Sequence, residues 1–199
     1  MSAVVIIDNG GGNVASVRYA LGRLGVEAEV TVDATLIRTA ARVILPGVGA
    51  AGDAMRRLRA TGLDVLIPTL RQPLLGICLG MQLLFESSAE DDSACLGVLP
   101  GRVARLTAAP GLRVPHMGWT RLAATRASPL LAGIGGDGYA YFVHSYAAPV
   151  GPDTVATADH GGPFTAVVSH GNFHGAQCHP ERSGTTGARL LRNFLDLGG

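Results

Sequence analysis

A cysteine between two glycines is the feature of this sequence best suited to chemistry. Cys78 follows an apolar run, Leu74 to Ile77, and precedes apolar residues at helical spacing from Leu79 to Phe85. This pattern predicts a strand, a sharp turn and a helix, with glycines where a Cβ would meet the facing backbone. The start of a helix favours a thiolate through its free N–H groups and its dipole. Taken alone, Cys78 is equally consistent with a buried core cysteine.

A nucleophilic cysteine needs a base that takes its proton and a third group that orients the base. His179 is the best placed of the six histidines because it ends a predicted strand, 173–178, and sites in open α/β sheets form beyond the carboxyl ends of strands. Glu181 lies two residues further on, where a carboxylate can fix the imidazole tautomer. Each residue alone could be structural. Together with Cys78, they predict a nucleophile, a base and an orienting carboxylate.

Acyl chemistry at a cysteine also needs N–H donors for the developing oxyanion. The backbone N–H of Leu79, directly after the nucleophile, is one candidate. A second is expected from the glycine-rich turn 46–49, at Val48 or Gly49. A plain βα turn would use the same glycines, so this segment alone does not decide between the two interpretations.

Two other kinds of site are weaker alternatives. His170, His174, Cys178 and His179 crowd one predicted hairpin, but neither the C-x₂-C nor the H-E-x-x-H spacing of zinc sites is present. The glycine run 10–12 resembles a phosphate-binding loop, but it lacks G-x-G-x-x-G and the Lys-Ser/Thr of nucleotide loops. We therefore predict no metal site and no cofactor.

Composition excludes several classes of protein. The 199 residues are 47% apolar and 16% charged, with a net charge of +1, which is typical of one globular domain spanning 1–199. The absence of a basic cluster argues against nucleic acid as a partner. No basic leader and no apolar stretch of membrane-span length is present, so we expect no membrane association. Three cysteines cannot pair completely, which favours a cytoplasmic location.

The order of elements predicts the fold class. In the first half, strands at 4–8, 27–31, 43–45 and 74–78 alternate with helices at 14–24, 35–40, 51–59 and 63–70, where Pro68 would end or kink the last. Short strands follow at 103–106, 119–123, 139–143, 155–158, 164–168 and 173–178, and a helix at 185–197. The pattern predicts an α/β fold with an open, mostly parallel sheet flanked by helices and with antiparallel strand additions in the C-terminal half.

These motifs resemble those of a known family. The segment 76–82 around Cys78, with His179-Pro180-Glu181, is similar to the Cys-His-Glu core of class I glutamine amidotransferases, which have a flavodoxin-like sheet. The segments 6–13, 45–49, 115–119 and 141–146 further resemble the glutaminase subunits of imidazole glycerol phosphate synthase, an enzyme of histidine biosynthesis. The resemblance extends from the first strand to the last helix.

The resemblance implies a reaction and its site residues. Cys78 would attack the side-chain amide of L-glutamine, His179 would move the proton and Glu181 would orient His179. A γ-glutamyl thioester would form and be hydrolysed, which gives glutamate and ammonia. The family's glutamine contacts correspond to Gly49, Gln82, Glu90, Tyr141 and Ser145.

The resemblance also implies a partner. The ammonia would pass to a separate (β/α)₈-barrel cyclase subunit, which makes imidazole glycerol phosphate and aminoimidazole carboxamide ribotide, and the two chains would form a heterodimer. The chain is too short to contain that barrel. Positions expected to face it are Asn13, Met117, Trp119 and Arg182. On sequence alone, Trp119 is equally consistent with a core tryptophan.

Three residues depart from the family pattern. Asn9 replaces an aromatic residue, Arg182 a lysine and Cys178 a phenylalanine. None belongs to the expected triad, and strand alternation predicts that Cys178 is a core residue pointing away from the side of His179. Two other functions remain open: a class I domain that serves another synthase or acts as a free γ-glutamyl hydrolase, and a silent subunit that only docks.

Overall fold

The structure, a computed structural model, describes residues 4–10 and 13–198, so Gly11 and Gly12 of the glycine run lie outside the described residues. The helices are α1 (Val14–Arg23), α2 (Ala34–Thr39), α3 (Ala51–Ala60), α4 (Leu63–Leu66), α5 (Leu79–Gln82) and α6 (Gly184–Leu195). The strands are β1 (Val4–Ile7), β2 (Ala28–Thr31), β3 (Arg42–Gly47), β4 (Leu74–Cys78), β5 (Phe85–Ser88), β6 (Ser93–Ala94), β7 (Leu99–Arg105), β8 (His116–Arg121), β9 (Ala123–Ala124), β10 (Tyr139–His144), β11 (Tyr146–Ala147), β12 (Thr154–Asp159), β13 (Pro163–His170) and β14 (Phe173–Ala176).

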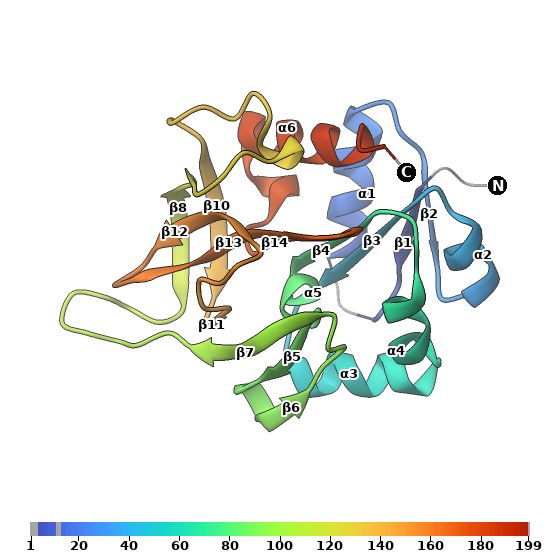
Figure 1. Ribbon diagram of the computed structural model, residues 1–199, viewed down its shortest axis with the longest axis horizontal. Helices are drawn as coiled ribbons and strands as arrows, with labels where there is room; N and C mark the ends of the chain where they lie inside the picture. Colours follow the sequence, from blue (N-terminus) through green and yellow to red (C-terminus); the bar gives the residue numbers. More distant parts are fainter. Residues whose placement is uncertain (1–3, 11–12, 199) are drawn as a thin grey trace.

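The main sheet has the order β2-β1-β3-β4-β14-β13-β12-β9 (Figure 1). Its first five strands in this order pair in parallel, and β13, β12 and β9 extend it antiparallel. This arrangement confirms the predicted fold class, including the antiparallel additions in the C-terminal half. The parallel strands β4 and β14 are neighbours, so Cys78 and the segment after β14 meet at one edge of the sheet.

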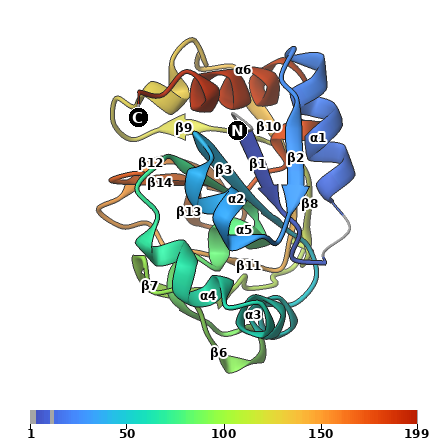
Figure 2. The same cartoon turned by 90° about the vertical axis from the view of Figure 1, so that its right-hand side faces the viewer.

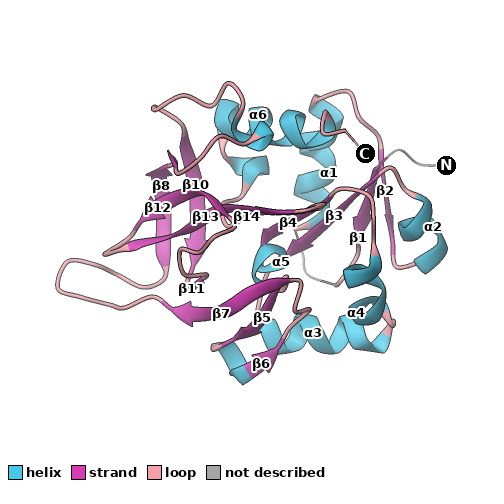
Figure 3. Ribbon diagram, viewed as in Figure 1, coloured by secondary structure: helices cyan, strands magenta, loops and turns pink. Residues whose placement is uncertain are grey.

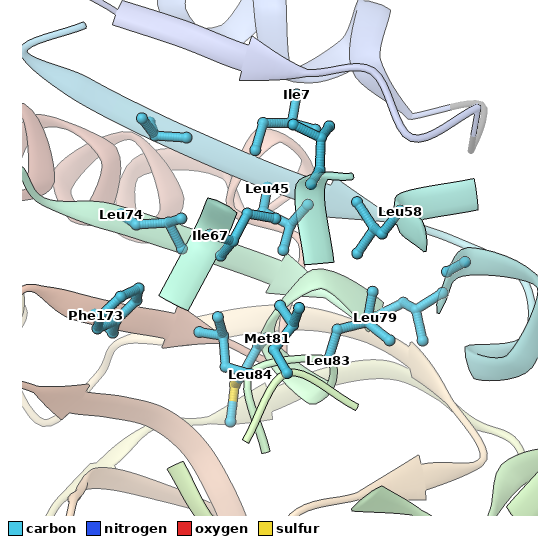
Figure 4. Packing of buried hydrophobic residues seen from close by; sticks show 14 of the residues in the cluster. Ile7, Leu45, Leu58, Ile67, Leu74, Leu79, Met81, Leu83, Leu84 and Phe173 are labelled. Atoms are coloured by element: carbon cyan, nitrogen blue, oxygen red, sulfur yellow. The ribbon is translucent and has the colours of Figure 1, made fainter. Parts of the chain in front are cut away.

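Helices and short strands cover both faces of this sheet (Figures 1 and 2). Along β1, Val4 and Ile6 pack on the side of α1 and α6, whereas Val5 and Ile7 pack on the side of α2, α3 and α4. This strict alternation on a strand buried on both sides is why β1 is an uninterrupted apolar run. Figure 4 shows the hydrophobic core on the side of α2, α3 and α4, which Leu79 joins just after Cys78.

Two smaller sheets complete the molecule (Figure 3). β8 pairs antiparallel with β10, with Met117 opposite Val143 and Trp119 opposite Tyr141. The other has the order β11-β7-β5-β6. The end of β10, Ser145 and the start of β11 form one wall of the site described below. None of the described helices has the length and apolar character needed to cross a membrane.

Two predicted helices are shorter than expected. The helix predicted from Leu79 to Phe85 ends at Gln82, and β5 begins at Phe85. The reason is tertiary: the Leu84 carbonyl accepts the backbone N–H groups of Val98 and Leu99 instead of continuing a helical ladder. The predicted helix 63–70 is α4 followed by a 3₁₀ turn at Ile67–Thr69, the change that Pro68 predicts.

Candidate active site

The turn between β4 and α5 holds Cys78 in a strained conformation. Its φ is 53° and its ψ is −113°, values that L-residues rarely adopt. The flanking glycines allow this turn, because a Cβ on Gly80 would lie 1.8 Å from the Leu45 carbonyl oxygen and one on Gly76 would lie 2.6 Å from the Gly80 oxygen. The turn is therefore as tight as the sequence predicted, and it presents the thiol at the carboxyl end of β4.

His179 and Glu181 follow β14 and form a buried pair. The imidazole Nδ1 donates to Glu181 Oε1 at 2.8 Å, and the two side chains are only 5% and 1% exposed. A carboxylate accepts hydrogen bonds only, so this bond fixes the proton on Nδ1 and leaves Nε2 as the basic nitrogen. Nε2 is buried and has no hydrogen-bond partner among the described residues. It is therefore available to take a proton.

The electrostatics favour a charged imidazole. Burial opposes the charged form of His179, but its interactions with Cys78 and Glu181 outweigh burial and raise its pKa to about 10. Burial would likewise raise the pKa of Glu181, but the interactions with His179 and Asn13 lower it. The arrangement therefore favours the charged form of His179 beside the Glu181 carboxylate.

Asn13 is a second donor to the same carboxylate. Its Nδ2 donates to Glu181 Oε1 at 2.7 Å and lies 3.2 Å from His179 Nδ1. The side chain was expected to face a partner; in the structure Asn13 is buried against the His179–Glu181 pair and also lines the cavity. No local sequence pattern signals this contact, because Asn13 and Glu181 lie far apart in the chain.

Backbone hydrogen bonds fix the loop that carries the histidine. The N–H of His179 donates to the Tyr141 carbonyl at 2.9 Å. The Ser183 hydroxyl donates to the His179 carbonyl at 2.7 Å and accepts the Tyr141 N–H at 2.9 Å. Strand β10 is thus tied directly to the segment that holds His179.

A cavity of about 370 Å³ opens at this edge of the sheet. It brings together most of the residues that the sequence singled out: Asn13, Val48, Gly49, Cys78, Leu79, Gln82, Glu90, Ser145, His179 and Arg182. Gly49 has a φ of +92°, which lets the turn after β3 present its backbone to the cavity. The volume is in the range of small-molecule sites.

Two of the residues expected to contact glutamine are fixed by hydrogen bonds to other parts of the protein. Glu90 Oε2 accepts the Ala51 N–H at 2.9 Å, and burial raises the pKa of this carboxyl. Gln82 Nε2 donates to the Tyr146 carbonyl at 2.7 Å and to Gln177 Oε1 at 2.9 Å. Both amide hydrogens of Gln82 are used, so only its Oε1 remains as an acceptor for a ligand in the cavity.

Four predicted residues do not line this cavity. Glu181 lies behind His179, as an orienting carboxylate must. Met117 and Trp119 on β8 are 63% and 55% exposed, which excludes the core alternative for Trp119. Tyr141 contributes its backbone to the His179 loop, and its ring packs edge-on against Trp119 with a centroid distance of 6.1 Å.

The structure adds Val143, His144 and Tyr146 to the cavity wall. The Cys78 sulfur lies 4.0 Å from the Val143 carbonyl. The motif 141–146 could have identified these residues from the sequence, but only Tyr141 and Ser145 of this motif were predicted to be site residues. His144 is buried, which lowers its pKa to about 3, so it is neutral at pH 7.

Cys178 is a core residue, as strand alternation predicted. It is almost completely buried, and burial raises the pKa of its thiol. Among the described residues, no group of three or more histidine, cysteine or acidic side chains is arranged to hold a metal ion.

Comparison with known proteins identifies the family. The model of the family "Glutamine amidotransferase class-I" matches residues 5–197. Proteins named imidazole glycerol phosphate synthase subunit HisH, from Xanthomonas oryzae and Xylella fastidiosa, are each 61% identical over 99% of this chain and 98% of their own length.

Solved structures agree on the fold. A glutamine amidotransferase crystal structure superposes with a TM-score of 0.76 at 22% identity, covering 98% of this chain and 97% of its own. A structure described as a GMP synthase subunit from Thermoplasma acidophilum gives 0.72 at 19% identity, covering 98% and 93%. The chain therefore belongs to the class I glutamine amidotransferases and, within them, to the HisH subunits of imidazole glycerol phosphate synthase, the glutaminases of histidine biosynthesis.

Proposed function

We propose that this glutaminase works through a γ-glutamyl thioester on Cys78, with His179 as the base and Glu181 as the group that orients it. The observation that carries the proposal is the free, buried Nε2 of His179, whose other nitrogen is bonded to a buried carboxylate, in a cavity that Cys78 also lines. These are the parts that cysteine acyl transfer requires.

In the acylation step, the Cys78 sulfur attacks the amide carbon of glutamine and an S–C bond forms. The C–N bond then breaks, and the proton that His179 took from the thiol passes to the leaving nitrogen, which departs as ammonia. Water next attacks the thioester and gives its proton to His179. The S–C bond breaks, glutamate leaves and the thiol is restored.

Donors for the oxyanion are proposed at the cavity wall. The N–H of Leu79 begins α5, where helical N–H groups lack helical partners, and Val48 and Gly49 supply the second donor from the opposite turn. For the rest of the substrate, Glu90 and Gln82 Oε1 are acceptors suited to its amino group, and Ser145 lines the same cavity. Tyr141 acts through its backbone, by holding the His179 loop.

The ammonia is proposed to pass to a (β/α)₈-barrel cyclase in a heterodimer. The relatives above are named as synthase subunits, which supports a partner of this kind. Arg182 is exposed and lines the cavity, and Met117 and Trp119 expose large apolar area on β8. We propose that these residues contact the barrel. A cytoplasmic location, which three free cysteines support, belongs to the same proposal.

The test is glutamate release from glutamine by this protein alone and with the cyclase plus its ribonucleotide substrate. Strong stimulation by the loaded cyclase is the expected result. Hydrolysis at the same rate with and without the cyclase would contradict the partner and favour a free hydrolase. No hydrolysis by the folded protein under either condition would contradict the chemistry.

A further inference from the structure

A buried pair of glutamine side chains leads from the cavity wall to the nucleophile. Gln177 follows β14 directly, is 0% exposed, and holds its backbone N–H on the Ala166 carbonyl at 2.8 Å. Its side-chain Nε2 lies 3.8 Å from the Cys78 sulfur. Its Oε1 accepts a hydrogen bond from Gln82 Nε2 at 2.9 Å. The glutaminase steps proposed above do not use Gln177.

One backbone carbonyl decides which way both amides point. An amide group can be turned by 180° without changing its shape, so its orientation follows from its partners. The Tyr146 carbonyl can only accept, and Gln82 lies 2.7 Å from it, so the NH₂ of Gln82 must face this oxygen. The second hydrogen of that NH₂ points at Gln177 Oε1. The NH₂ of Gln177 must therefore face the Cys78 sulfur.

The Tyr146 carbonyl is itself held by His144 of β10, which is in turn hydrogen-bonded to His116 of β8. His144 Nδ1 donates to it at 2.9 Å, and because His144 is neutral its Nε2 is an acceptor. His116 lies with Nδ1 3.2 Å from that Nε2, and its own Nε2 lies 2.9 Å from the Thr120 hydroxyl. Every donor in this series of hydrogen bonds, from Thr120 to the Tyr146 carbonyl, has a defined acceptor, so the direction of each bond is determined.

We propose that Gln177 donates a side-chain hydrogen bond to the Cys78 sulfur and stabilises its thiolate form, and that Gln82 is the positioning residue that sets the donor. A thiolate accepts an N–H far better than a thiol does, since hydrogen bonds to charged groups are about twice as strong as neutral ones. The bond therefore favours ionisation before attack. It also favours departure of the thiolate from the thioester. The inference rests on the proposed function only in taking Cys78 as the nucleophile.

The test is the rate of Cys78 alkylation by iodoacetamide as a function of pH, followed by mass spectrometry of the peptide that contains Cys78 so that Cys95 and Cys178 do not interfere. Gln177→Met keeps the length of the side chain and removes the donor. We expect the pH midpoint of alkylation to rise by about one unit, so that alkylation below the midpoint is about tenfold slower. Gln177→Glu should raise the midpoint further, because it places a negative charge beside the sulfur.

Gln72→Met is the matched control. Gln72 Nε2 also donates to a backbone carbonyl, that of Ile37, but it does not line the cavity, and its loss should leave the midpoint unchanged. Thermal melts establish that each variant is folded, and Gln177→Glu retains an acceptor for Gln82 if the methionine variant does not fold. An unchanged midpoint in a folded Gln177 variant overturns the proposal. A shifted midpoint in a protein that releases no glutamate would leave this inference standing and contradict the proposed function instead.

Discussion

At the scale of single residues, the site is defined by which atoms have partners and which do not. Glu181 Oε1 receives both His179 Nδ1 and Asn13 Nδ2, whereas His179 Nε2 has no partner among the described residues. A buried polar nitrogen without a hydrogen bond costs free energy, and such groups persist where they have a role. The role that we propose for this nitrogen is to accept the Cys78 proton.

Replacing the nucleophile should separate the two half-reactions. We expect Cys78→Ala to lower glutamine-dependent synthesis by the complex at least about 10⁴-fold, because no acyl acceptor remains. Ammonia-dependent synthesis should be retained, since the cyclase does not need the thiol once ammonia is supplied. Both rates can be measured on the same purified complex. Loss of both would mean that the division of labour between the chains is wrong.

Asn13 should act on the chemistry and not only on a partner. We expect Asn13→Ala to lower kcat for glutamine about tenfold in the isolated protein, the effect of losing one charge-assisted bond worth ~1.4 kcal/mol. Asn13→Asp, which cannot donate and adds a negative charge beside Glu181, should be worse. The readout is glutaminase activity without the cyclase. Unchanged basal activity, together with weaker cyclase binding, would restrict Asn13 to the interface.

At the scale of elements, the conformation of Cys78 depends on the β4–α5 turn, which packs against the end of β3. Gly47, Gly76 and Gly80 all lie where a Cβ would come within 3.0 Å of neighbouring atoms, mostly backbone. The positive φ of Cys78 is maintained because these backbones are in contact on either side. Strain of this kind persists only where the surroundings determine it.

Gly80→Ala should therefore be strongly destabilising. The new methyl group would overlap the Leu45 carbonyl, and we expect a loss of at least about 3 kcal/mol in the free energy of unfolding. Gly22→Ala in α1 is the control: its Cβ meets nothing within 4 Å, and it should stabilise the helix by ~0.5–1 kcal/mol. Urea unfolding measures both. Equal stability of the two variants would show that the turn can relax.

At the scale of the whole molecule, the candidate active site lies close to an exposed apolar surface on β8. β10 pairs with β8 on one side and carries the backbone contacts to the His179 loop. The exposed side chains of Met117 and Trp119 therefore lie one strand away from the loop that holds the base. A partner that binds β8 would contact an element tied directly to the site.

Trp119→Ala should weaken cyclase binding without unfolding the protein. Because Trp119 is 55% exposed, its loss should change the free energy of unfolding by less than ~0.5 kcal/mol. Because we propose Trp119 as an aromatic anchor of the interface, its loss should raise the Kd for the cyclase at least about 30-fold. Val65→Ala, at a 72% exposed position on α4, is the control and should leave the Kd unchanged. Calorimetric titration measures both.

Stability should fall in mild acid because His174, unlike the buried His179, stays neutral in the folded protein. Burial lowers the pKa of His174 to about 4, below its unfolded value near 6.5, so the unfolded chain binds a proton that the native state does not. Stability is then present above pH 6.5 and is lost as pH falls toward 4, by up to ~1.4 kcal/mol per unit. His174→Asn should reduce this slope, measured by urea unfolding at several pH values. An unchanged slope would mean that His174 is protonated in the native state.

The sequence by itself determined the sheet class, the tight turn at Cys78 and the family. Local patterns carry these features: period-two and period-3.6 apolar spacing, glycines on both sides of a cysteine, and motifs that each lie within a few residues. Most of the candidate site residues also lie in such motifs. The fold brings these motifs together because the carboxyl ends of neighbouring parallel strands meet.

Only the tertiary structure decided how those residues contact one another. Asn13 on Glu181, Gln177 on Cys78 and the Tyr146 carbonyl on Gln82 join segments far apart in the chain, and no local pattern encodes such contacts. The early end of α5 has the same origin, since the Leu84 carbonyl, just beyond the helix, accepts the N–H groups of Val98 and Leu99. Local sequence determines which elements form, whereas the hydrogen bonds around Cys78 depend on how those elements pack.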